Sequence, residues 1–144
     1  MKGSETKLVA YMQGSSKRFL IPVYQRNYNW KTENCKQLFE DLLWIIRNNR
    51  KSHFFRSVVS VFNPDGSSDE FLVIDGQQRL TTVSLLFLAM HNLIENKVIT
   101  PKSSSLSQRI YEEYLVDKWQ DRETRIKLKP VKNDWRAYGK LFDI

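Results

Sequence analysis

Apolar residues recur three or four positions apart in two long segments, as they do on the buried face of a helix. In residues 32–49 they fall at Leu38, Leu42, Ile45 and Ile46. Additional leucines leave few polar faces on the second segment, whose stripe consists of Leu80, Val83, Phe87, Met90 and Ile94. The pattern predicts two long helices, of which the second is central and largely enclosed.

Shorter apolar runs, rich in aromatic and β-branched residues, predict strands at residues 18–21, 54–62, 71–74 and 125–128. Pro22 and Pro130 follow the first and the last run and end them, because proline cannot donate a hydrogen bond to a sheet. Turn-forming residues at 63–68 separate the middle two runs. These two runs are therefore expected to form an antiparallel hairpin.

Three other helices are expected at residues 6–13, around residues 106–114 and after Asp134. The last one shows no capping residue and is expected to be still in progress at Ile144, so we expect this chain to be the front part of a longer protein. Together the elements predict an α+β fold. Residues 1–100 are expected to form one domain, and residues 101–144 the truncated start of a helical continuation.

The composition indicates a folded protein with an excess of positive charge. Its 41% hydrophobic and 27% charged residues are typical of globular chains and argue against disorder. The formal net charge of +7 favours anionic partners such as nucleic acid or nucleotides. A solvated basic face that only keeps the protein soluble explains the same charge equally well.

Cysteine and histidine are too few for several kinds of site. Cys35 has no partner for an intramolecular disulfide, and with only His53 and His91 beside it no zinc-ligand spacing exists. The N-terminus lacks a secretory signal, and the most apolar run, residues 80–90, is shorter than the ~20 residues that span a bilayer. We expect a cytoplasmic protein without a membrane anchor.

The polar segment Asp75-Gly76-Gln77-Gln78-Arg79 joins a predicted buried strand to the predicted central helix. A helix start presents unpaired amides and the positive end of the helix dipole, which suits a phosphate. Gly76 lets the backbone approach a ligand, Arg79 can pair with a phosphate, and the two glutamines can orient water or hydroxyl groups. Alternatively, Asp75 and Gln78 form a capping box, which leaves Gln77 and Arg79 unexplained.

A second segment, residues 21–30, alternates large aromatic residues with amides and an arginine. Such a stretch can line a pocket by stacking on a base and bonding to phosphate. Equally, Tyr24, Tyr28 and Trp30 can simply cover the edge of the core.

Together, the two segments closely resemble the N-terminal domain of GmrSD-type restriction endonucleases, within the superfamily of the partitioning protein ParB and sulfiredoxin. The resemblance rests on residues 21–30 (IPVYQRNYNW), on the pair Phe54-Phe55 and on residues 74–82 (IDGQQRLTT). It covers residues 6–95 well and the rest loosely. It implies a ParB/sulfiredoxin-like fold, with a small mixed sheet that contains a β-hairpin and packs against several helices.

The resemblance also implies a regulatory domain that binds and hydrolyses a nucleoside triphosphate in prokaryotic defence against modified foreign DNA. DNA is then an expected partner, and oligomers are possible. DNA cleavage would reside in a separate C-terminal nuclease domain or a partner subunit. The alternative is a module that recognises DNA or a modified base without hydrolysis. Clustered carboxylates typical of a metal-dependent nuclease are not apparent in this sequence.

For hydrolysis, Mg²⁺ or a similar cation is expected to accompany the nucleotide, and Asp75 is the residue expected to hold the cation or to orient water. The expected catalytic residues are Asp75, Gln77, Gln78 and Arg79, and the expected nucleotide-binding residues are Tyr24, Gln25, Arg26, Gly76, Arg79 and Thr81. One departure concerns Arg56, because many relatives have glycine after the Phe-Phe pair. Arg56 is expected either to add a phosphate contact or to narrow the site.

Overall fold

The computed structural model describes residues 6–14, 16–51, 56–66, 69–122 and 124–142. Its sheet contains four strands in the order β2-β3-β1-β4, where β1 is Arg18–Leu20, β2 is Val59–Phe62, β3 is Glu70–Asp75 and β4 is Leu128–Lys129. β2 and β3 are antiparallel, whereas β1 runs parallel to both β3 and β4. The expected mixed sheet with one hairpin is confirmed.

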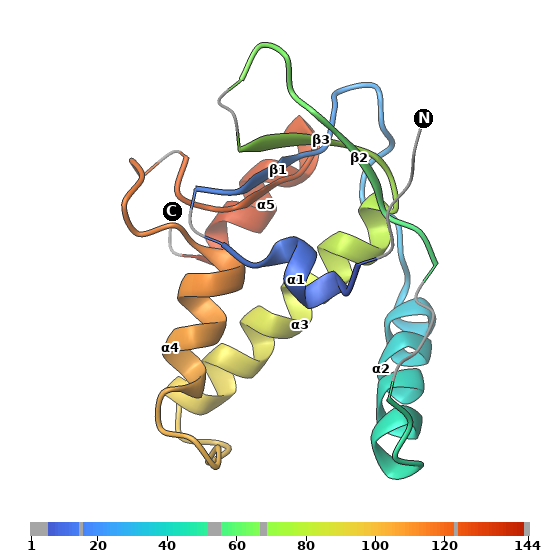
Figure 1. Ribbon diagram of the computed structural model, residues 1–144, viewed down its shortest axis with the longest axis vertical. Coiled ribbons are helices and arrows are strands. Elements are labelled where there is room, and N and C mark those ends of the chain that lie inside the picture. Colours follow the sequence, from blue (N-terminus) through green and yellow to red (C-terminus); the bar gives the residue numbers. More distant parts are fainter. Residues whose placement is uncertain (1–5, 15, 52–55, 67–68, 123, 143–144) are drawn as a thin grey trace.

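Helices surround this sheet and extend away from it (Figure 1). They are α1 (Leu8–Met12), α2 (Thr32–Arg47), α3 (Gln77–Glu95), α4 (Leu106–Ile110) with a π-helical continuation at Tyr111–Leu115, and α5 (Lys132–Lys140). The predicted α+β class and both long helices are confirmed. None of the described helices is long and apolar enough to cross a bilayer.

The hairpin is shorter than the sequence predicts. β2 begins at Val59, and Arg56 before it has a left-handed φ of 65°, which interrupts a regular extended strand. The expected strand start at Phe54-Phe55 falls in residues 52–55, outside the described residues. The hairpin turn at 63–68 is described up to Gly66.

Both C-terminal elements lie a few residues from their predicted positions. The last strand pairs Leu128 with Phe19 of β1, and the residues before it form only an isolated bridge between Val116 and Ile126. α5 begins at Lys132 rather than after Asp134, and it ends at Lys140. The expectation of a helix still in progress at Ile144 is therefore wrong, with residues 143–144 outside the described part.

One hydrophobic core joins the sheet to the helices. Val73, Leu80 and Ile126 are fully buried within it, and the Tyr11 ring of α1 lies 4.9 Å from the Phe19 ring of β1. Residues after 100 contribute β4 and several core side chains, namely Ile110, Leu115, Val116, Ile126, Leu128, Val131, Tyr138 and Phe142. The predicted boundary at residue 100 thus does not separate two hydrophobic cores.

A buried lysine stands in this core, which the hydrophobic pattern gave no reason to expect. Lys127 is 2% exposed, and its ammonium group donates hydrogen bonds to the carbonyl oxygens of Met12 (2.6 Å) and Glu113 (2.7 Å). Burial, with the neighbouring charge of Lys17, lowers the pKa of Lys127 to about 8. Lys127, which directly precedes β4, thus connects this strand to α1 and to the π-helical segment.

Candidate functional site

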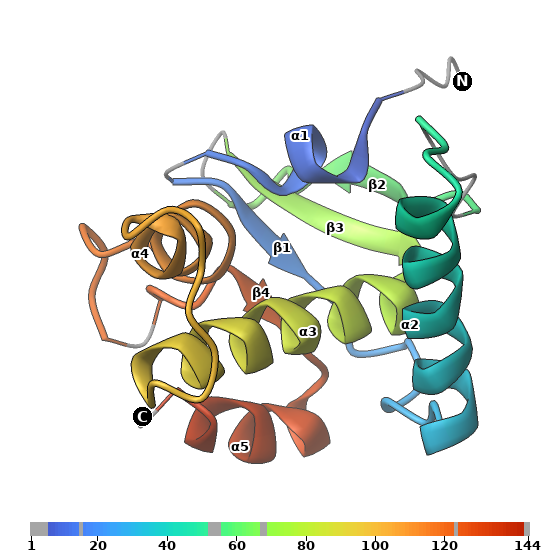
Figure 2. The same cartoon turned by 90° about the horizontal axis from the view of Figure 1, so that it is seen from below.

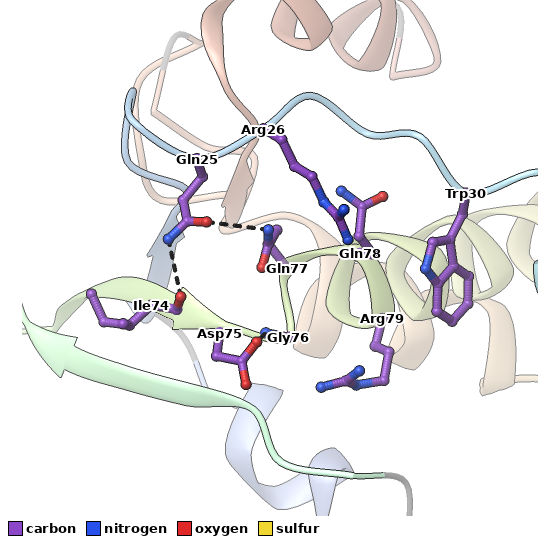
Figure 3. A pocket seen from close by; sticks show the side chains of 9 residues that line it. All are labelled: Gln25, Arg26, Trp30, Ile74, Asp75, Gly76, Gln77, Gln78 and Arg79. Carbon is purple, nitrogen blue, oxygen red and sulfur yellow. Dashed lines mark hydrogen bonds between the residues drawn. The ribbon is translucent and has the colours of Figure 1, made fainter.

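A polar pocket of about 370 Å³ lies where β3 ends and α3 begins. The chain that follows β1 forms its other wall, because β1 and β3 are parallel neighbours and their carboxyl ends meet at one edge of the sheet. Figure 3 shows the lining residues, which are Gln25, Arg26, Trp30, Ile74, Asp75, Gly76, Gln77, Gln78 and Arg79. Both segments singled out in the sequence therefore meet in one pocket.

Gly76 makes the sharp turn from strand to helix. Its φ of 87° lies in the left-handed region, which favours glycine. A Cβ atom at this position would stand 2.9 Å from the carbonyl oxygen of Ser57 and 2.9 Å from a methyl carbon of Val58. Glycine is required here by the fold, whether or not a ligand also approaches the backbone.

The predicted capping box does not form. β3 continues through Asp75, Gly76 occupies the N-cap position, and no side chain caps the first turn of α3. Asp75 instead accepts a hydrogen bond from the amide of Gly76 (2.8 Å). The amides that begin α3 thus remain without a side-chain cap, which leaves the positive end of this helix open to an anion.

Gln78 holds the opposite wall of the pocket in place. Its side chain is 5% exposed, donates to the carbonyl oxygen of Asn27 (3.1 Å) and accepts from the amide of Asn29 (2.9 Å). Both polar atoms of this amide are engaged with backbone on either side of Tyr28. These contacts support a positioning role for Gln78, in place of the expected contact with water.

Replacing Gln78 with alanine is expected to lower the free energy of unfolding by about 1–2 kcal/mol, because two hydrogen bonds to the loop are lost. Ligand affinity of the pocket should fall with it, since Arg26, which lines the pocket, stands on the same loop. Thermal unfolding and calorimetric titration measure the two effects. Gln37→Ala is a matched control on exposed α2 surface, and equal effects of the two variants would contradict the positioning role.

Tyr28 points into the protein instead of the pocket. Its amide donates to a carboxylate oxygen of Asp134 in α5 (2.6 Å), and its hydroxyl lies 3.0 Å from the hydroxyl of Thr82 and 3.3 Å from the sulfur of Cys35. Burial, followed by the hydrogen bond to Cys35, raises the pKa of Tyr28 to about 12. Tyr28 therefore attaches the loop to α2, α3 and α5.

Two of the expected nucleotide-binding residues do not line the pocket. Tyr24 is 71% exposed and stands outside the lining, and the buried Thr81 hydroxyl donates to the carbonyl oxygen of Gln77 within its own helix (2.7 Å). Trp30 is the member of the aromatic series Tyr24, Tyr28 and Trp30 that lines the pocket. The sequence offered no local signal to choose among these three rings.

Gln25 and Gln77 connect the two walls directly. The side-chain amide of Gln77 donates to the side-chain oxygen of Gln25 (3.2 Å), and the amide of Gln25 donates to the carbonyl oxygen of Ile74 (3.0 Å). The dashed lines in Figure 3 mark both bonds. The side-chain oxygen of Gln77 makes no hydrogen bond to a described residue and is free to accept one from water or a ligand.

Two guanidinium groups give the pocket its positive charge. Arg79 donates to the carbonyl oxygen of Ser57 (2.6 Å), while its Nε is buried without a hydrogen-bond partner among the described residues. Arg26 is exposed, and the described ion pairs include neither arginine. Charges left unpaired at the start of a helix favour an anionic ligand.

Among the described residues that line this pocket, Asp75 is the only carboxylate. Within the described part of the chain, no three histidine, cysteine or acidic side chains group into a metal site. Mg²⁺ is commonly held by one or two carboxylates together with substrate phosphates and waters. Asp75 is exposed at the pocket and fits that mode.

Arg56 occupies a backbone conformation that suits glycine, with φ of 65°, and its side chain is exposed. It does not line the pocket, so neither an added phosphate contact nor a narrower site follows from its position. Instead, the left-handed backbone at this position favours glycine.

Replacing Arg56 with glycine is expected to raise the free energy of unfolding by up to about 1 kcal/mol, because the left-handed strain is removed. Chemical denaturation measures the change. Arg47→Gly serves as the control, since glycine in the last turn of α2 lowers stability by up to about 1 kcal/mol. A lower free energy of unfolding for Arg56→Gly would contradict the claim that the left-handed backbone of Arg56 is strained.

Comparison with known proteins assigns the family. No curated protein matches the chain. The family model described as "GmrSD restriction endonuclease, N-terminal domain" matches residues 9–144. This range includes both pocket walls and continues through β4 and α5, beyond the residues that carried the resemblance in the sequence. The chain therefore belongs to the family of GmrSD restriction endonuclease N-terminal domains.

Proposed function

We propose that this domain binds a nucleoside triphosphate in the pocket between β3, α3 and the 25–30 loop, and that it hydrolyses the nucleotide to regulate a DNA-cleaving partner. The observation that carries the proposal is the pair Arg26 and Arg79 at the uncapped start of α3, neither of which forms an ion pair with a described residue. A volume of about 370 Å³ is within the usual range for small-ligand pockets.

In this proposal each wall has its own task. Arg79 and the first amides of α3 hold phosphate oxygens from one side, and Arg26 approaches from the other. Trp30 offers an aromatic face to the base or sugar at the rim. Asp75 holds Mg²⁺, which supplies neutralising charge when bound, and the free oxygen of Gln77 orients the attacking water.

Calorimetric titration with a nucleoside triphosphate, with and without Mg²⁺, tests the binding, and release of inorganic phosphate tests the hydrolysis. We expect saturable binding at a single site and phosphate release that requires Mg²⁺. The proposal would be rejected if none of the common nucleoside triphosphates binds in the presence of Mg²⁺. Binding without phosphate release would restrict the domain to a nucleotide sensor.

A second candidate function is recognition of DNA or a modified base without hydrolysis. It is favoured by Trp30 in the lining beside Arg26, because an aromatic ring and an arginine also suit an exposed base and its phosphate. Affinity for DNA would then fall steeply with salt, as phosphate contacts release counterions. Loss of that affinity in Trp30→Ala, with nucleotides failing to bind, would select this alternative.

The family description names a restriction endonuclease, which indicates a role in defence. We further propose that DNA cleavage resides in a separate C-terminal nuclease domain or a partner subunit, and that the protein acts in the prokaryotic cytoplasm on modified foreign DNA. A nuclease assay of this chain alone is expected to give no cleavage.

A further inference from the structure

Helix α5 has an apolar face in the core and a basic face outside it. Within the helix Tyr138 is buried and Trp135 packs against the core, and the flanking residues Val131 and Phe142 are buried as well. Lys132, Arg136 and Lys140 follow one another every four residues and are all exposed. Four residues correspond to slightly more than one helical turn, so side chains at this spacing lie on the same side of the helix. The three cations therefore form a stripe about 12 Å long on the outer side. Figure 2 shows α5 at the lower edge of the molecule.

The positive charge of this stripe is not compensated within the described structure. None of the ion pairs formed by described residues includes Lys132, Arg136 or Lys140. Like charges four residues apart destabilise a helix by about 0.2–0.5 kcal/mol per pair, and Lys132 also stands at the positive end of the helix dipole. The arrangement costs stability in the isolated domain, and a polyanion would offset that cost.

Beside these cations the outer face carries the exposed side chains of Asn133 and Ala137, and Leu141 at the end of the helix is a single exposed large apolar side chain. Binding to a membrane surface requires an apolar face that enters the lipid, and the apolar face of α5 is occupied by the core. Exposed Lys129, just before the helix, extends the same basic segment. A regular row of cations with one exposed apolar neighbour, Leu141, is suited to a row of phosphates.

We propose that the outer face of α5 binds the phosphate backbone of duplex DNA. The surface is separate from the nucleotide pocket, and the proposal does not depend on nucleotide binding. On its inner side, however, the same helix contacts the pocket loop, because Asp134 accepts the hydrogen bond from the amide of Tyr28 (2.6 Å). A single hydrogen bond thus connects the proposed DNA-binding helix α5 directly to the loop that carries Arg26.

The test compares two variants that each remove three positive charges. One is Lys132→Gln/Arg136→Gln/Lys140→Gln, and the matched control is Lys36→Gln/Lys97→Gln/Lys102→Gln, whose side chains are exposed on α2 and on the connection between α3 and α4. Fluorescence anisotropy of a labelled 20-base-pair duplex is followed between about 50 and 200 mM salt. Thermal unfolding and nucleotide titration accompany each variant and separate this proposal from the function of the pocket.

For the α5 variant we expect at least about tenfold weaker DNA binding at 100 mM salt, and a salt slope reduced by about 2.7, because three phosphate contacts are lost. The control should keep the wild-type slope. Equal loss in both variants would assign the binding to net charge and overturn the proposal. No duplex binding by the wild type at 50 mM salt, or binding to heparin that is equally tight and equally sensitive to the α5 changes, would also overturn it.

Discussion

Arg79→Ala and Arg26→Ala are each expected to weaken binding of a nucleoside triphosphate by about 10- to 100-fold, which corresponds to one charge-assisted hydrogen bond or bidentate pair of about 1.5–3 kcal/mol. The larger loss of affinity is expected for Arg79→Ala. Among the described residues, the Nε of Arg79 has no hydrogen-bond partner although it is buried, and only one oxygen accepts a bond from its guanidinium. Calorimetric titration in Mg²⁺ measures both variants.

The control for the two arginines is Arg122→Ala, which removes the same side chain from an exposed turn outside the pocket. Its nucleotide affinity should stay close to that of the wild type. Stability must be measured alongside, since Arg79 also bonds to the carbonyl oxygen of Ser57. If Arg79→Ala unfolds at a lower temperature and still binds nucleotide normally, the arginine has only a structural role.

Gly76→Ala is expected to lower the free energy of unfolding by about 2–4 kcal/mol. The left-handed backbone costs an alanine about 1–2 kcal/mol, and the new methyl group would clash with backbone that can give way only if the segment just before β2 moves. The contact involved is 2.9 Å to the Ser57 carbonyl oxygen. Denaturant unfolding, which reports the midpoint and the slope, measures the loss.

Gly139→Ala offers a control of opposite sign. Gly139 lies within α5, its φ is not left-handed, and an added Cβ would meet no atom within 4 Å. Alanine should therefore raise the free energy of unfolding by up to about 1 kcal/mol, through its better helix propensity. Equal and small effects of the two substitutions would contradict the tight strand-to-helix turn at Gly76.

The elements that could be predicted are those with a local signal. α2 and α3 were recognisable from apolar residues at helical spacing, and the hairpin from its turn residues between two apolar runs. β4 was harder to place because it consists of only two residues, too few for a local pattern. It forms because Leu128 pairs with Phe19, which lies more than a hundred residues earlier in the sequence. The position of such a short strand is determined by the neighbouring strand with which it pairs.

The candidate site was predictable as two segments, but the tasks of individual residues were not. Spacing alone made Asp75 and Gln78 look like a capping box. In the structure Gly76 takes the cap position, and Gln78 bonds to backbone some fifty residues earlier in the chain, at Asn27 and Asn29. Such contacts depend on the path of the loop after β1, for which the local sequence contains no signal.

The same limit applies to the aromatic residues of the loop. Tyr24, Tyr28 and Trp30 have similar chemistry and close spacing, yet one is exposed, one is hydrogen-bonded inside the protein and one lines the pocket. What separates them is the position of Asp134, Thr82 and Cys35, which come from three different helices. Only the assembled fold brings these groups to Tyr28.

The most direct test of the nucleotide pocket is a crystal structure of this domain with a non-hydrolysable nucleoside triphosphate and Mg²⁺. The phosphates are expected against the amides of Gln77 to Arg79, with both Arg26 and Arg79 in contact and Asp75 facing the metal. Phosphates bound elsewhere on the protein, or a pocket without nucleotide at saturating concentration, would contradict the assignment of this site.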